Sequence, residues 1–144
     1  MRHNKLISAA IALGMIAFFT MGSVPSTWAS PPTPVPVTIT AVFDFSTFPN
    51  VSGTFTTSGA LTISGSATMD IYSNVNGVRA HCVVTLIASD GSGTITIHQE
   101  CQFASSPPKG RWEIVSGTGA YADVRGNGSL RMPPNTEAMK GFIY

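Results

Sequence analysis

Two histidines and a glutamate are the residues of this sequence whose types and spacing could support chemistry. His98 and Glu100 lie two positions apart on one segment, and His81 lies on the segment before it. On one face of a sheet, such a set could bind a divalent metal ion or supply a general base. The alternative is a row of polar side chains facing solvent, which any half-buried sheet carries. We favour the solvent-facing row and expect neither a metal nor another cofactor.

The two cysteines, Cys82 and Cys101, lie on the same two segments. If Asp90 to Gly93 forms a four-residue hairpin loop, Cys82 lies directly opposite Cys101 on the apolar face of the hairpin. Opposed cysteines in an oxidising compartment predict a structural disulfide, and the alternative is a pair of free buried thiols. The chain has no second cysteine pair, which argues against a zinc site.

A glycine-rich segment, residues 116–129, reads SGTGAYADVRGNGS. It lacks the Gly-Lys-Ser/Thr ending of a phosphate-binding loop and the third glycine that opens a helix in the dinucleotide fingerprint. We therefore interpret the segment as a tight bend between two strands, because glycine adopts backbone conformations closed to other residues. The residues assigned to this structural turn are Gly117, Gly119, Tyr121, Arg125 and Gly126.

Residues 112–128, WEIVSGTGAYADVRGNG, resemble the signature I-x-GGTGxYAxxRGxG of allene oxide cyclase-like and dirigent-like barrels and of similar exported bacterial proteins; the core of the match runs from Ile114 to Gly128. Ser116 stands where the pattern often has glycine, and Asp123 where it often has a small residue. The resemblance implies an eight-stranded antiparallel barrel in which Tyr121 packs back on the barrel. Plant members cyclise an unsaturated epoxide or guide radical coupling inside the barrel, which implies an apolar cavity with a few polar groups.

The elements that would position these residues are short strands, because apolar and polar residues alternate with a period of two between turn signals from Val37 onward. About eight or nine such segments predict an all-β domain, most simply a closed antiparallel barrel of eight strands, with a β-sandwich as the fallback. The inward face is expected to hold Gln99 as its polar exception and the apolar residues Phe43, Phe45, Met69, Leu86, Ile97, Phe103, Trp112 and Ile114.

The first 29 residues predict a secretory signal peptide, since Arg2 and Lys5 precede an uncharged run and a small residue, Ala29. The uncharged run is about 16 residues long, short of the roughly 20 that a membrane-spanning helix needs. Residues 30–36 form a proline-rich linker and residues 37–144 a single domain. We expect that domain to be secreted or periplasmic, without membrane contact after signal cleavage.

The charge of the expected mature chain argues against nucleic acid as a partner. Residues 30–144 hold six Lys and Arg, scattered along the sequence, against seven Asp and Glu. A weakly acidic chain lacks the basic footprint that nucleic-acid binding requires.

These observations favour an exported barrel without catalytic activity that binds an apolar small molecule or another protein. The alternative is a cyclase or isomerase acting on an apolar substrate in the barrel lumen, which predicts an open apolar cavity with one or two buried ionisable groups. Glu113, Asp44 and Tyr72 are the nearest candidates for those groups, and only if the inward and outward faces are exchanged. A hydrolase or metal enzyme built on His81, His98 and Glu100 is the third hypothesis.

Overall fold

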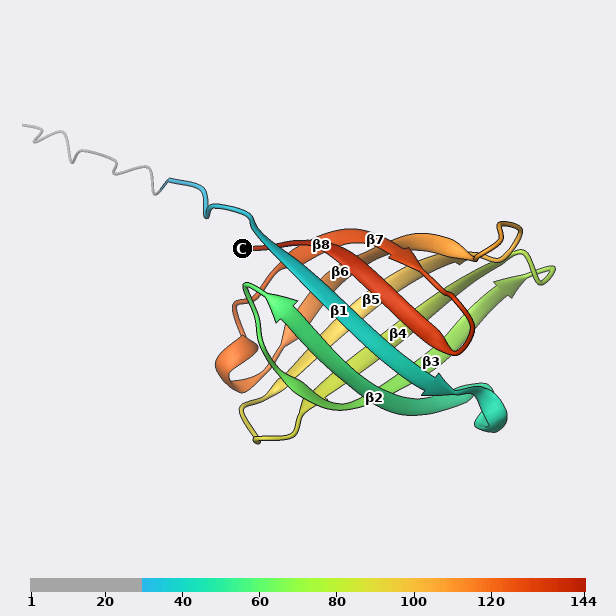
Figure 1. The fold of residues 1–144 in the computed structure, drawn as a ribbon, viewed down its shortest axis with the longest axis horizontal. Helices are drawn as coiled ribbons and strands as arrows, with labels where there is room; N and C mark the ends of the chain where they lie inside the picture. Colours follow the sequence, from blue (N-terminus) through green and yellow to red (C-terminus); the bar gives the residue numbers. More distant parts are fainter. Residues whose placement is uncertain (1–29) are drawn as a thin grey trace, which may run out of the picture. The chain divides into compact units, whose positions relative to one another are not determined.

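The structure, a computed structural model, describes residues 30–144, with the side chains of residues 73–75 excepted. These residues form a closed barrel of eight antiparallel strands, in which each strand pairs with the next along the chain and β8 returns to pair with β1 (Figure 1). The predicted all-β barrel is confirmed, and the β-sandwich is not the fold. The predicted signal peptide, residues 1–29, lies outside the described residues.

The strands are joined by short loops, and two of these loops contain a single turn of 3-10 helix, η1 (Phe45–Thr47) and η2 (Gly119–Tyr121). The strands are β1 (Val35–Asp44), β2 (Asn50–Gly59), β3 (Ser64–Val75), β4 (Arg79–Ala88), β5 (Thr94–Gln102), β6 (Lys109–Gly117), β7 (Gly126–Arg131) and β8 (Thr136–Ile143). No helix of residues 30–144 is long and apolar enough to cross a membrane.

Because the strands alternate in direction, the loops gather at two ends of the barrel (Figure 1). We call one end the mouth; it consists of the loops 45–49, 76–78, 103–108 and 132–135. We call the other end the base; it consists of the loops 60–63, 89–93 and 118–125 and the start of β1.

The first strand begins two residues earlier than the alternation predicts, at Val35. Pro36 has no N–H to donate, but its carbonyl accepts a hydrogen bond from the N–H of Ala60 at 3.0 Å. Pro36 also lies opposite Phe142 of β8. The last residues of the expected linker are therefore part of the barrel.

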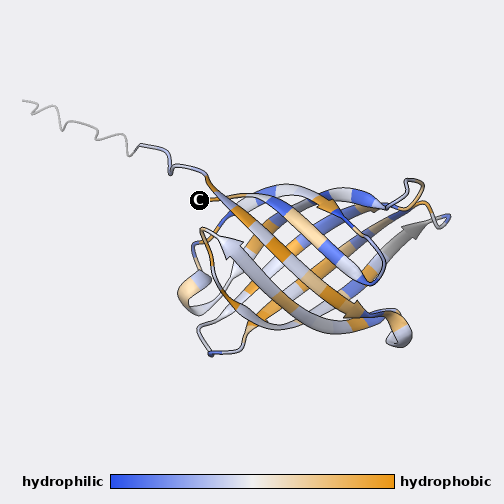
Figure 2. Ribbon diagram, viewed as in Figure 1, coloured by the Kyte–Doolittle hydropathy of each residue, from blue (hydrophilic) through white to orange (hydrophobic). Residues whose placement is uncertain are grey.

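Buried and exposed side chains alternate along the strands, as in β4 and β5. Figure 2 shows hydrophobic and hydrophilic bands on several of the strands. Most of the expected inward apolar residues are buried in the lumen: Phe43, Met69, Leu86, Ile97, Trp112 and Ile114. Phe45 was predicted to be inside but is 39% exposed, because β1 ends at Asp44 and η1 turns the chain over the mouth. Phe103 is only partly buried, since it lies in the loop after β5.

The hairpin of β4 and β5 has a different register from the predicted one. Cys82 lies opposite Gln99, and Cys101 lies opposite Ala80, so the predicted pairing of Cys82 with Cys101 was wrong by two residues. Ser89 does not pair with Thr94: Ile87 lies opposite Thr94, and in the turn the N–H of Ala88 donates to the carbonyl of Gly93 at 3.1 Å. A shift of two residues keeps each side chain on its face, so the inward and outward assignments of the hairpin hold.

The predicted disulfide is not confirmed, because Cys82 and Cys101 are free thiols, each 1% exposed. With the observed register they are diagonal neighbours on the lumen face rather than directly opposed, and their side chains are hydrogen-bonded to each other. This hydrogen bond, together with burial, raises the pKa of the Cys101 thiol above its ordinary value. The pair is therefore a buried part of the core.

The glycine-rich segment forms a bend at the base. Tyr121 is 6% exposed, and its hydroxyl lies 2.6 Å from the hydroxyl of Ser92 in the loop before β5. Gly119 has a φ of +58°, a conformation that favours glycine. The N–H of Arg125 donates to the carbonyl of Tyr144 at 3.0 Å, and β7 begins at the next residue. The bend thus links three parts of the base: the loop 89–93, the start of β7 and the end of the chain.

Candidate functional site

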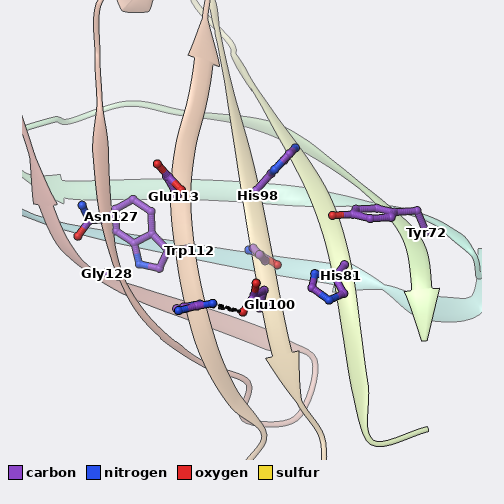
Figure 3. A pocket seen from close by; sticks show the side chains of 10 residues that line it. Tyr72, His81, His98, Glu100, Trp112, Glu113, Asn127 and Gly128 are labelled. Atoms are coloured by element: carbon purple, nitrogen blue, oxygen red, sulfur yellow. Dashed lines mark hydrogen bonds and ion pairs between the residues drawn. The ribbon is translucent and has the colours of Figure 1, made fainter. Parts of the chain in front are cut away.

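The polar face singled out in the sequence lies on the outside of the barrel, over β4 and β5 (Figure 3). His81 lies directly opposite Glu100, and His98 lies opposite Val83. The Glu100 carboxylate is already paired with Arg111 of β6: its Oε2 lies 2.8 Å from Nε and 2.6 Å from Nη2 of the guanidinium. The ring of His81 lies against Tyr72, with 6.0 Å between the ring centroids.

These contacts give the two histidines and Glu100 no common ligand position. Within residues 30–144 no group of three or more His, Cys, Asp or Glu side chains is placed to hold a metal ion. The surrounding depression, about 550 Å³, is shallow, and its charged side chains Glu100, Arg111 and Glu113 are all exposed. These charged side chains are therefore solvated, whereas catalytic groups are usually held in a buried environment.

A second pair of polar side chains, which the sequence reasoning did not join, lies inside the barrel. Gln99 of β5 and Glu137 of β8 are each 1% exposed. The amide Nε2 of Gln99 donates to Oε2 of Glu137 at 3.0 Å and lies 3.3 Å from the sulfur of Met139. Because β5 and β8 are not neighbours in the barrel, this hydrogen bond crosses the lumen.

The pair is only partly satisfied. Oε1 of Gln99 and Oε1 of Glu137 are buried without a hydrogen-bond partner. Such groups cost free energy, and in native proteins each calls for an explanation. Burial raises the pKa of Glu137 to about 7, and the hydrogen bond from Gln99 opposes the shift. Glu137 can therefore hold or release a proton near neutral pH.

The position of Glu137 follows from the alternation of β8. It lies on the same face as Met139, which is fully buried, and opposite Ala41 of β1. The sequence analysis did not name Glu137, although it is the second residue of β8, which begins at Thr136. Glu137 and Met139 are two residues apart, so they lie on the same face of a strand; this spacing is the signal that would have identified Glu137 as an inward residue.

Glu137 also contributes to a pocket of about 370 Å³ at the mouth of the barrel, which we call the mouth pocket. Apart from Glu137, the walls of the pocket are largely apolar. The residues lining it are Phe43, Phe45, Ser106, Pro107, Pro108, Met132, Pro133, Pro134, Asn135, Thr136 and Glu137. The mouth pocket therefore combines largely apolar walls with a few polar residues, which is the usual composition of a small-molecule site.

The two acidic residues and the tyrosine that the sequence analysis named as possible lumen groups do not lie in the lumen. Glu113 and Asp44 are exposed, and Tyr72 is 60% exposed. Asp44 accepts a hydrogen bond from the N–H of Ser46 at 2.9 Å and so caps η1. These side chains lie outside the barrel, as the predicted inward and outward faces require. The buried carboxyl group is that of Glu137 on β8.

The comparisons found no matching family model, no matching curated protein and no matching solved structure. The resemblance to allene oxide cyclase-like and dirigent-like barrels therefore rests on residues 112–128 and on the number and direction of the strands.

Proposed function

We propose that this protein is an exported barrel that binds an apolar small molecule in the mouth pocket and does not transform it. The observation that carries the proposal is the largely apolar mouth pocket, whose lining includes Glu137. An apolar ligand in this pocket would contact Phe43, Phe45 and Met132.

Binding is tested with N-phenylnaphthylamine, an uncharged apolar fluorophore that brightens when it leaves water. We expect a saturable increase in fluorescence with the wild-type protein. Ser106→Trp places a large side chain at an exposed wall position of the mouth pocket and should abolish the increase. Ser58→Trp, at an exposed position on the outside of β2, is the matched control and should bind like the wild type. Equal fluorescence from all three proteins would contradict the proposal.

A second candidate function is a cyclase or isomerase that works in the lumen, as the family resemblance implies. The observation in its favour is the pKa of about 7 for Glu137, which suits a general acid or base at neutral pH. We rank it second because Glu137 is the one ionisable residue among the described residues that line the mouth pocket. Turnover of an unsaturated epoxide that disappears in Glu137→Gln would favour it over simple binding.

Export is part of the proposal and has its own test. A signal peptide over residues 1–29 and cleavage before Ser30 would place the barrel in the periplasm or outside the cell. The intact mass of the exported protein should then be that of a chain beginning at Ser30. A full-length mass would contradict export by this route.

A further inference from the structure

The cations of the barrel, scattered along the sequence, are gathered in space. Arg79 begins β4, Lys109 begins β6 and Arg131 ends β7, so all three lie where their strands meet the mouth. The strand registers place them in one row across the outer face, since Arg79 lies opposite Gln102, Gln102 opposite Lys109, and Lys109 opposite Arg131. Neighbouring strands are about 4.8 Å apart, so this row spans roughly 15 Å.

Arg111 lies two residues further along β6, in the next row of the same face. We call Arg79, Lys109, Arg111 and Arg131 the basic edge; they are four of the six Lys and Arg of residues 30–144, and all four are exposed. Glu100 neutralises Arg111. The other three have no ion-pair partner among the described side chains. The basic edge therefore gathers about three uncompensated positive charges at one end of residues 30–144, whose six Lys and Arg stand against seven Asp and Glu overall.

Exposed apolar side chains protrude from the same end of the barrel. Phe48 is 60% exposed, Val78 44% and Phe45 39%, and all three lie in loops of the mouth. Pro107, Pro133 and Pro134, also in mouth loops, are exposed as well. Apolar side chains that stand in water beside a cluster of cations are typical of surfaces that lie on a lipid bilayer, where the apolar groups enter the headgroup region.

We propose that the mouth of the barrel docks on a membrane surface rich in anionic phospholipid. The basic edge binds the phosphate groups, and Phe45, Phe48 and Val78 enter between the headgroups. A soluble polyanion would use the cations but would leave the aromatic side chains in water, so the membrane accounts for both features. This proposal departs from the expectation of a domain without membrane contact, which considered only spanning segments.

Docking does not depend on the ligand proposed above, because it needs only the basic edge and the apolar loops. It would nevertheless turn the mouth pocket toward the bilayer, since Phe45 belongs to both the pocket wall and the protruding loop. An apolar molecule could then pass between the lipid and the pocket without crossing water.

The test measures cosedimentation of the processed protein with vesicles. One set of vesicles is pure phosphatidylcholine, and the other is an equimolar mixture of phosphatidylcholine and phosphatidylglycerol. We expect binding to the mixed vesicles only, weakened by added salt. Each neutralised cation should weaken it about fivefold, so the triple variant Arg79→Gln, Lys109→Gln, Arg131→Gln should bind roughly a hundredfold more weakly. Phe48→Ser should weaken binding about tenfold.

Two matched controls lie away from the mouth. Arg125→Gln removes a cation at the base, and Phe142→Ser removes an aromatic side chain that is 53% exposed on β8; both should bind like the wild type. Circular dichroism establishes that each variant is folded. Absent binding, or equal binding to both kinds of vesicle, would overturn the proposal. It is also overturned if polyphosphate displaces the protein completely and Phe48→Ser has no effect, because the partner would then be a soluble polyanion.

Discussion

Replacing Glu137 by glutamine tests whether a carboxyl group buried in the lumen controls the stability of the barrel. Glutamine has nearly the same shape and can accept the hydrogen bond that Gln99 donates to Oε2, but it cannot ionise. Its amide group can also donate to the unpaired Oε1 of Gln99. We expect the variant to match the wild type in acid and to be the more stable protein above neutral pH.

The magnitude follows from the pKa of Glu137, which is about 7 in the folded protein against 4.5 for an unperturbed glutamate. Between these values the folded state holds the proton that the unfolded state has released, so the free energy of unfolding falls as the pH rises. The slope is about 1.4 kcal/mol per pH unit, and the whole window is worth about 3 kcal/mol. This loss should be complete above pH 7 and absent in Glu137→Gln.

The assay is urea unfolding of both proteins across this pH range, followed by circular dichroism. Glu113→Gln, which removes an exposed carboxyl group from β6, is the control and should keep the wild-type pH dependence. Hydrogen bonds from Ser46 and Ser92 lower the pKa values of Asp44 and Asp90, so their contributions are lost only in more acidic solution. Parallel stability curves for the wild type and Glu137→Gln above pH 5 would refute the reasoning.

Three further predictions concern the core and the base. Tyr121→Phe removes the hydroxyl that lies 2.6 Å from Ser92 Oγ and should lower the free energy of unfolding in urea by about 1 kcal/mol; no change would mean that the contact does not hold the bend. Gly128→Ala would place a Cβ in steric clash with the carbonyl oxygen of Lys140 and should cost about 3 kcal/mol by the same measurement, and a stability equal to the wild type would contradict the observed pairing of β7 with β8. Cys82 and Cys101 should not react with a thiol reagent in the folded protein but should both react in denaturant; a mass lower by two hydrogens would show instead that they bond in the exported protein.

Alternation along the strands was sufficient to predict the fold and most of the core. Ile97, Trp112 and Ile114 are buried as their parity predicts, and Phe45 fails only because the strand ends one residue earlier. The face on which a side chain lies depends on its position along its own strand, so it can be predicted correctly even when the pairing with the next strand is wrong by two residues. Register is not set by alternation: the two-residue shift of the β4–β5 hairpin accompanies a turn in which the N–H of Ala88 donates to the carbonyl of Gly93.

The candidate site was harder to predict because its residues come from strands far apart in the sequence. Gln99 was recognised as a polar residue on the inward face, but its partner Glu137 lies 38 residues away on a strand that is not its neighbour. The basic edge likewise exists only through the pairing of four strands, because Arg79, Lys109 and Arg131 belong to separate segments of the sequence. Contacts across a barrel depend on its closure, which no single segment encodes.

The order of the strands around the barrel has a consequence for how the chain assembles. Every strand pairs with its neighbours in sequence, and the exception is the pairing of β1 with β8, which brings Val35 opposite Ile143. Consecutive hairpins can form early because they close short loops, whereas the β1–β8 seam closes a loop of nearly the whole domain and pays the largest entropy. We therefore expect the seam to form last. Until it forms, both of its edges offer unpaired backbone groups to a second copy of the chain, and this late step is where misassembly by strand exchange would occur.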